Sequence, residues 1–129
     1  MPGFAIEAPE GAPTAAKQEM LKKISEALHE AYRIPDIRGF VREYPAESFS
    51  QDGRIGAEPM RPVCALDAPE LASLDVKQEL ANKICAAIAD AYQDIANTAQ
   101  TVVLIRQYAD ANQGINQVFG ARPARAPRA

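Results

Sequence analysis

The residue with the clearest capacity for chemistry is Pro2, which follows the first methionine. Removal of Met1 would leave proline with a free secondary amine, whereas other backbone nitrogens are amides without basicity. An α-amino group has a pKa of about 7.7–8.0, and burial lowers that pKa because it disfavours the charged form. Such an amine can act as a general base near pH 7. Pro2 is therefore the first catalytic candidate, although proline also follows methionine in proteins where it has no catalytic role.

Four other residues are weaker candidates for chemistry. His29 lies between charged neighbours on a predicted helix, and Asp36 falls in a predicted turn, where each is typical of a solvated position. Cys64 falls in a predicted strand and Cys85 on the apolar side of a predicted helix, so we expect both to be small core residues. Two cysteines and one histidine are too few for a Cys/His zinc site in one chain. We expect neither a metal nor a cofactor.

The composition disfavours several classes of function. The chain has 129 residues, of which 47% are hydrophobic, and this is enough for a packed core. Its formal charge of −3 provides no basic field for nucleic acid or anionic lipid. The apolar stretches are shorter than the roughly 20 residues that a bilayer requires, and the N-terminus lacks a signal-peptide pattern. We expect a cytoplasmic protein that binds neither nucleic acid nor membrane.

The chain repeats itself at an offset of 60 residues. Residues 17–32 align with residues 77–92 with eight identities in sixteen positions. Further along, the offset becomes 64, where residues 41–44 (VREY) face residues 105–108 (IRQY). The second copy therefore carries about four extra residues, which we place in the loop near residues 95–100.

Each copy predicts a strand, a long helix and a second strand. Apolar residues alternate with others in the segment from Gly3 to Ala8, and residues 62–67 are its counterpart. Helical spacing of apolar residues follows to Tyr32, with Thr14 as the expected N-cap, and recurs around Leu80 and Ile84. The second strands are expected at residues 37–44 and 101–108. Each copy is thus a βαβ unit with two parallel strands.

Two such units predict an α+β fold with a four-stranded sheet and both helices on one face. The other face would be bare, and we expect the protein to cover it by forming an oligomer. The units are expected at residues 2–60 and 61–120, and Gly53, Gly56 and Pro59 mark the linker between them. Residues 121–129 contain three arginines and two prolines and are expected to be a flexible basic tail.

These features resemble the tautomerase superfamily, whose type member is 4-oxalocrotonate tautomerase. Its short members are βαβ units that begin with Met-Pro, and its longer members are fusions of two such units. The resemblance covers residues 2 to about 114 and is carried by four features of this sequence: Pro2, the turn at Glu10 and Gly11, the helix 17–32, and the segment 38–49 (RGFVREYPAESF). Within that last segment, Arg38 and Phe49 match the family's arginine and the aromatic residue eleven positions later.

The resemblance implies a role for each of these residues. Pro2 would be the base that moves a proton in an enol or 2-oxo acid. Arg38 would bind the carboxylate or carbonyl oxygen of the substrate, for which its planar fork is suited. Phe49 would be the apolar wall that keeps the amine neutral. The family also implies the architecture of macrophage migration inhibitory factor (MIF) and a homotrimer of fused chains.

The sequence departs from the family pattern in its other arginines. Ala12 stands where the type member has a carboxylate-binding arginine, and residues 68–73 lack the paired arginines of cis-3-chloroacrylic acid dehalogenase and malonate semialdehyde decarboxylase. A small carboxylate substrate would then be held by Arg38 with help from Arg42 or Arg106, which strand alternation places on the same face. The linker residues Arg54 and Arg61 are the other options.

The second unit is expected to be a scaffold. The nitrogen of Pro62 lies in a peptide bond and cannot accept a proton, and Val102 and Gln113 replace Arg38 and Phe49. We therefore expect one site in each chain.

The resemblance favours an isomerase that interconverts the enol and keto forms of a small 2-oxo or 2-hydroxydienoate acid. A hydratase, dehalogenase or decarboxylase of the same superfamily is a second possibility, with Asp36, Glu43 or Tyr108 available to activate water. A structural protein that has lost substrate binding is a third.

Overall fold

The computed structural model describes residues 2–70, 73–109, 112–115 and 118–119. Met1 and the expected basic tail at residues 121–129 lie outside this range. The elements in chain order are β1 (Gly3–Pro9), α1 (Thr14–Tyr32), β2 (Arg38–Tyr44), the 3₁₀ turn η1 (Ala46–Ser48), β3 (Val63–Pro69), α2 (Leu74–Tyr92), the 3₁₀ turn η2 (Thr98–Gln100), β4 (Val102–Tyr108), β5 (Gly114–Ile115) and β6 (Val118–Phe119).

Both predicted helices are confirmed, with a correction at the start of α1. Thr14 is the first helical residue and not the N-cap, which is Pro13. The extended backbone of Pro13, with φ −61° and ψ 147°, directs its carbonyl to the amide of Lys17, and this bond starts the helix. In α2 the predicted type of capping does occur, because the Ser73 hydroxyl accepts a hydrogen bond from the amide of Val76.

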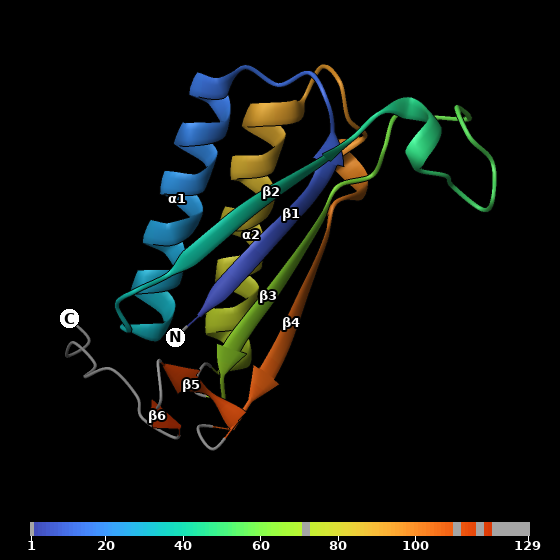
Figure 1. The fold of residues 1–129 in the computed structure, drawn as a ribbon. Coiled ribbons are helices and arrows are strands. Elements are labelled where there is room, and N and C mark those ends of the chain that lie inside the picture. The colour runs from blue at the N-terminus through green and yellow to red at the C-terminus, as the bar shows by residue number, and fades with distance from the viewer. Residues whose placement is uncertain (1, 71–72, 110–111, 116–117, 120–129) are drawn as a thin grey trace.

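The four main strands form one mixed sheet in the order β2-β1-β3-β4. β1 is parallel to β2 and β3 is parallel to β4, while the central strands β1 and β3 are antiparallel. Both helices cover the same face of the sheet (Figure 1). The register pairs Gly3 with Arg38 in the first unit and Val63 with Val102 in the second, which reproduces the offsets of 60 and 64 found in the sequence. The predicted fold is therefore confirmed.

The core lies between the sheet and the helices. Phe4, Ile6 and Ala8 of β1 are buried there, as are their counterparts in β3 and the inner faces of both helices. Full burial of a large aliphatic or aromatic side chain contributes about 1.5–3 kcal/mol, so this layer is the main source of stability. The ring of Phe4 occupies the space that a side chain at Gly39 would need, and glycine lets the ring pack against β2.

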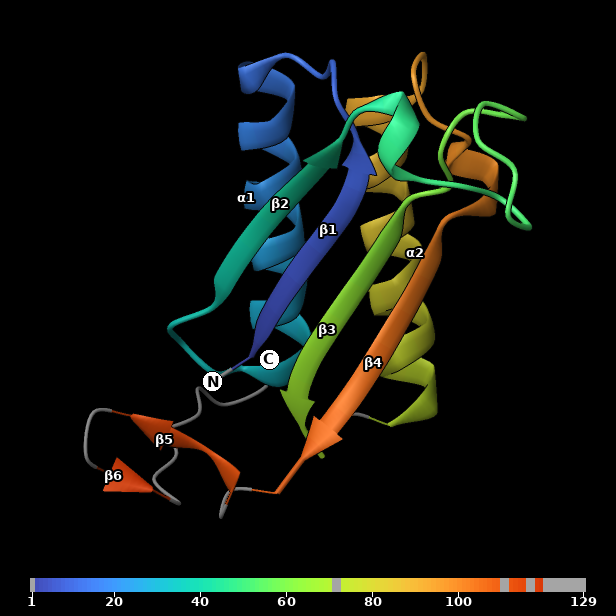
Figure 2. The same ribbon diagram turned by 45° about the vertical axis from the view of Figure 1, so that its right-hand side comes forward.

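The repeat also extends beyond the main sheet. An isolated bridge pairs Gln51 with Arg54, and the short strands β5 and β6 pair Ile115 with Val118 at the same offset of 64. Each βαβ unit is thus followed by a small hairpin. The hairpin of residues 51–54 lies at one end of the sheet and the β5–β6 hairpin lies at the other, near the N-terminus (Figure 2).

In the part of the chain that the structure describes, no helix or strand covers the face of the sheet opposite the helices, which is called the open face below (Figure 2). Apolar side chains of its outer strands are exposed there: Phe40 of β2 is 57% exposed, and Leu104 and Val102 of β4 are 52% and 47% exposed. Large apolar side chains gathered on one exposed surface are typical of an interaction surface. Among the described residues, no helix has the length and apolar character needed to cross a membrane.

Candidate active site

Pro2 is buried directly before β1, and its neighbour across the sheet is Arg38. The Pro2 carbonyl accepts a hydrogen bond from the Arg38 amide at 3.3 Å, and Gly3 pairs with Arg38 in the register of the parallel strands. The sheet therefore brings together the backbones of the two residues to which the family resemblance assigned the roles of base and carboxylate ligand. The end of the sheet where β1 and β2 begin and β3 and β4 finish is called the Pro2 end below.

The Arg38 side chain is accessible to a ligand. It is 62% exposed, and it forms an ion pair at 3.7 Å with the Asp36 carboxylate, which is 51% exposed. Exposed ion pairs of this kind contribute little free energy, typically about 0–1 kcal/mol. A substrate carboxylate that offers two oxygens to the guanidinium would therefore compete well with Asp36.

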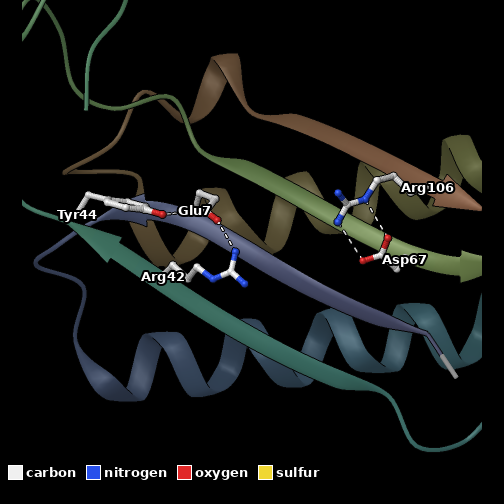
Figure 3. Close-up of polar contacts among 5 residues, drawn as sticks. All are labelled: Glu7, Arg42, Tyr44, Asp67 and Arg106. Carbon is white, nitrogen blue, oxygen red and sulfur yellow. Dashed lines mark hydrogen bonds and ion pairs between the residues drawn. The ribbon is translucent and has the colours of Figure 1, made fainter. Parts of the chain in front are cut away.

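A second arginine lies on the open face at the Pro2 end. Arg106 near the end of β4 makes a two-bond contact with Asp67 of β3, with Nε 2.9 Å from Oδ1 and one terminal nitrogen 3.0 Å from Oδ2 (Figure 3). The register places Arg38, Gly3, Asp67 and Arg106 in one row across the four strands. Asp67 is a participant that the sequence analysis did not identify, because its partner is 39 residues away.

The equivalent cluster at the opposite end contains Arg42, Glu7 and Tyr44. A terminal nitrogen of Arg42 lies 2.9 Å from Oε1 of Glu7, and the Tyr44 hydroxyl donates a hydrogen bond to the other oxygen of Glu7 (Figure 3). The bond from Tyr44 and the pairing with Arg42 lower the pKa of Glu7 although partial burial opposes the shift. The same hydrogen bond to Glu7 raises the pKa of Tyr44, and burial and the negative charge of Glu7 add to that shift. Arg42 therefore belongs to a different end of the sheet from Pro2.

Phe49 is also separated from Pro2 within the chain. It follows β2, which runs parallel to β1, so it emerges at the far end of the sheet, called the Pro62 end below. There it lines a cavity of about 430 Å³ with Pro62, Val63 and Val102. The expected apolar wall is thus not formed around Pro2 by Phe49 of the same chain. At the Pro2 end the repeat places Gln113, which follows β4.

The two linker arginines also lie away from the Pro2 end. Arg61 immediately precedes Pro62, and its Nε is 2.6 Å from Oε1 of Glu58. Arg54 pairs through its backbone with Gln51 in the hairpin beside the same cavity.

The proposed water-activating residues fall into two groups. Glu43 points toward the helices, where its oxygens bind Lys17 Nζ at 2.9 Å and the Tyr92 hydroxyl at 3.2 Å. Burial and Glu43 raise the pKa of Tyr92. Asp36 and Tyr108 lie at the Pro2 end, Asp36 before β2 and Tyr108 at the finish of β4. Only these two share an end with Pro2.

The remaining candidates occupy ordinary positions. His29 is exposed on α1. Cys64 is buried in β3, and burial raises its thiol pKa to about 12, while Cys85 is half-buried on α2. Among the described residues, no group of three or more His, Cys, Asp or Glu side chains could hold a metal ion.

Known structures share this fold over nearly the whole chain. A crystal structure of native fused 4-OT superposes with a TM-score of 0.80 at 22% identity, covering 92% of this chain and 95% of that chain. A fused 4-OT described as the F6 wild-type asymmetric trimer gives 0.79 at 19% identity with the same coverage, and malonate semialdehyde decarboxylase gives 0.68 at 14% identity over 91% of this chain and 92% of that chain. No protein-family model and no curated protein sequence matches the chain. The chain therefore has the tautomerase fold.

Proposed function

We propose that this chain is a tautomerase that uses Pro2 as a general base on a small 2-oxo or 2-hydroxydienoate acid. The observation that carries the proposal is the burial of Pro2 at the start of β1, hydrogen-bonded through its carbonyl to Arg38. This bond joins the start of β1 to the start of β2, where the Arg38 side chain is exposed, which supports the proposal. The similarity of the fold to fused 4-OT supports the same reading.

The proposed chemistry requires that Met1 be the initiator and be removed. Because burial disfavours the charged form of an amine, the Pro2 nitrogen would be neutral near pH 7. It would accept the hydroxyl proton of the enol and return it to a carbon atom, so the substrate changes only the position of one proton. Arg38 would hold the carboxylate and stabilise the negative charge that develops on the enolate.

We also propose that three copies assemble through the open face. The exposed Phe40, Leu104 and Val102 would be covered in such an assembly. Fused 4-OT structures of the same fold are described as symmetric and asymmetric trimers, which supports this stoichiometry.

The test combines intact-mass measurement with turnover of 2-hydroxymuconate and phenylenolpyruvate. We expect a mass that lacks Met1, and we expect Pro2→Ala to lower kcat by about 10²- to 10⁴-fold, the usual contribution of a general base. The matched control is Pro62→Ala, which changes a buried proline at the equivalent strand start without touching an amine. Retention of Met1, or equal activity of Pro2→Ala and wild type, would refute the proposal.

A second candidate is a hydratase or decarboxylase, which the presence of Asp36 and Tyr108 at the Pro2 end favours. It predicts turnover of an unsaturated acid or a 3-oxo acid that falls in Asp36→Asn or Tyr108→Phe. Absence of turnover on every acid, together with correct assembly, would identify a structural protein.

A further inference from the structure

The cavity at the Pro62 end of the sheet has no part in the reaction proposed at Pro2. It has a volume of about 430 Å³ and lies where the segment 49–62 passes beside the starts of β3 and β4 (Figure 2). Proteins bind small molecules in cavities of about 300–1,000 Å³. The cavity is therefore large enough to hold a small molecule.

The walls of this cavity are mainly apolar. Its apolar lining comes from both sides, with Phe49, Pro59 and Met60 on the segment before β3, and Pro62, Val63 and Val102 at the starts of the strands. Phe49 is only half-buried, so part of its ring remains accessible. Aromatic rings attract one another when their centres lie about 4.5–7 Å apart, which favours a flat apolar ligand beside Phe49.

The two charged side chains that line the cavity neutralise each other. Arg61 donates two hydrogen bonds to Glu58, at 2.6 Å and 3.3 Å, and the side-chain amide of Asn97 donates a third at 3.2 Å. The bonds from Arg61 and Asn97 lower the pKa of Glu58, and the bond to Glu58 raises the pKa of Arg61, so both groups stay ionised near pH 7. A charged ligand would find no free counter-charge here, and burial of an unpaired charge is unfavourable.

The repeat shows how this end differs from the Pro2 end. Val102 holds the register position that Arg38 holds in the first unit, and the nitrogen of Pro62 is an amide. On the neighbouring strand β1, the charge of Glu7 is paired with Arg42. Among the described residues that line the cavity, there is thus neither a basic amine nor an unpaired guanidinium for an acid.

Two side-chain amides at the cavity are available to a ligand. Gln51 and Gln100 both line it, and within the described part of the chain no hydrogen bond engages either amide group. A primary amide offers two N–H donors and one carbonyl acceptor. These groups can therefore bind a carbonyl, a hydroxyl or an amide of an uncharged molecule.

We propose that the cavity at the Pro62 end is a second binding site, which takes a flat, uncharged and mainly apolar molecule that carries one carbonyl, hydroxyl or amide group. The apolar walls cover the body of the ligand, and Gln51 or Gln100 binds its polar group. The inference goes beyond the proposed function, and it requires neither removal of Met1 nor turnover at Pro2.

Three probes of nearly the same shape test the charge preference. Benzamide is uncharged, benzoate is an anion and benzamidinium is a cation near pH 7. Each is titrated into the isotope-labelled full chain, and the NMR signals of the Phe49, Gln51 and Val102 amides report binding at this cavity. We expect saturable shifts with benzamide, and at least about 10-fold weaker binding of each ion because its charge stays unpaired.

Two variants test the residues that carry the argument. Val102→Arg should reverse the preference, so that benzoate binds more tightly than benzamide, because it restores a guanidinium at the position of Arg38. Gln51→Ala/Gln100→Ala should weaken benzamide binding about 2- to 10-fold, the loss of one hydrogen bond. The control Gln78→Ala removes an amide from the exposed side of α2 and should leave benzamide binding unchanged.

Absence of benzamide shifts at the three amides would overturn the inference, as would equal affinity for all three probes. A copy of the chain that fills the cavity would also abolish the shifts, and that result counts against the inference in the same way. Turnover of an acid by wild type without binding of benzamide would refute the second site and keep the proposed function. Benzamide binding without turnover of any acid would do the reverse.

Discussion

Removal of the Leu104 side chain should weaken the proposed trimer without weakening the fold. Leu104 is 52% exposed on the open face, midway along the outer strand β4. Full burial of such a side chain is worth about 1.5–3 kcal/mol, so covering its exposed half contributes about 1 kcal/mol per copy and about 3 kcal/mol per trimer. Loss of that free energy in Leu104→Ala should raise the trimer dissociation constant about 100- to 200-fold. Because three chains separate, the concentration at half-dissociation should rise about 10- to 15-fold.

Sedimentation velocity across a dilution series measures this shift directly. The matched control is Leu74→Ala, since Leu74 is 81% exposed at the start of α2 and lies on the helical side of the sheet. The Leu74→Ala variant loses the same atoms as Leu104→Ala, but its trimer should dissociate at the same protein concentration as wild type. Adding Phe40→Ala to Leu104→Ala should roughly double the loss of association free energy, because Phe40 is 57% exposed on the same face.

The reasoning fails if Leu104→Ala, like the control Leu74→Ala, dissociates at the same concentration as wild type. That result would mean that the apolar side chains of the open face are not covered by another copy. Far-UV circular dichroism of each variant at high concentration establishes that the fold is intact, so loss of folding cannot imitate loss of assembly.

Three further predictions concern the folded chain. Gly39→Ala should lower the free energy of unfolding in urea by about 1–3 kcal/mol, because a methyl group there collides with the Phe4 ring. The bond from Tyr44 lowers the pKa of Glu7, so the Glu7 carboxylate stabilises the fold above its ordinary pKa of 4.5 and this contribution disappears as the pH falls through the lower folded value. The difference in urea stability between wild type and Glu7→Gln should therefore be present at neutral pH and vanish in acid, and a constant difference would contradict the pKa shift. Cys64, with its thiol pKa raised to about 12, should react with thiol reagents only on unfolding, as a spectrophotometric thiol assay in native and denaturing buffer can measure.

The fold was accessible from the sequence because its periodicities are strong. Alternation of apolar residues defined β1, and helical spacing defined α1 to its last residue, Tyr32. The change of the repeat offset from 60 to 64 predicted an insertion between α2 and β4, and the turn η2 lies there. The start of α1 was misplaced by one residue because a threonine before a helix is a common cap, whereas here the backbone of Pro13 serves that position.

The arrangement of the site was only partly accessible, for a physical reason. Alternation tells on which face of a strand a side chain lies, and it placed Arg38, Arg42 and Arg106 together on the open face. It does not tell at which end of the sheet a residue emerges, because that depends on the antiparallel pairing of β1 with β3. Arg106 therefore lies at the Pro2 end, whereas Arg42 lies at the Pro62 end. Phe49 was assigned to Pro2 by the family resemblance, although β2, parallel to β1, carries it to the Pro62 end.

That antiparallel pairing has a consequence for how the two ends of the molecule can specialise. Two separate identical βαβ chains joined in this way would place every side chain twice, once at each end, and any substitution would alter both ends together. Fusion gives each position its own codon, so an arginine can stand at residue 38 while valine stands at residue 102. Each end can then be redesigned in the laboratory without disturbing the other, and the cavity beside Pro62 offers a place to build a second specificity into the same chain.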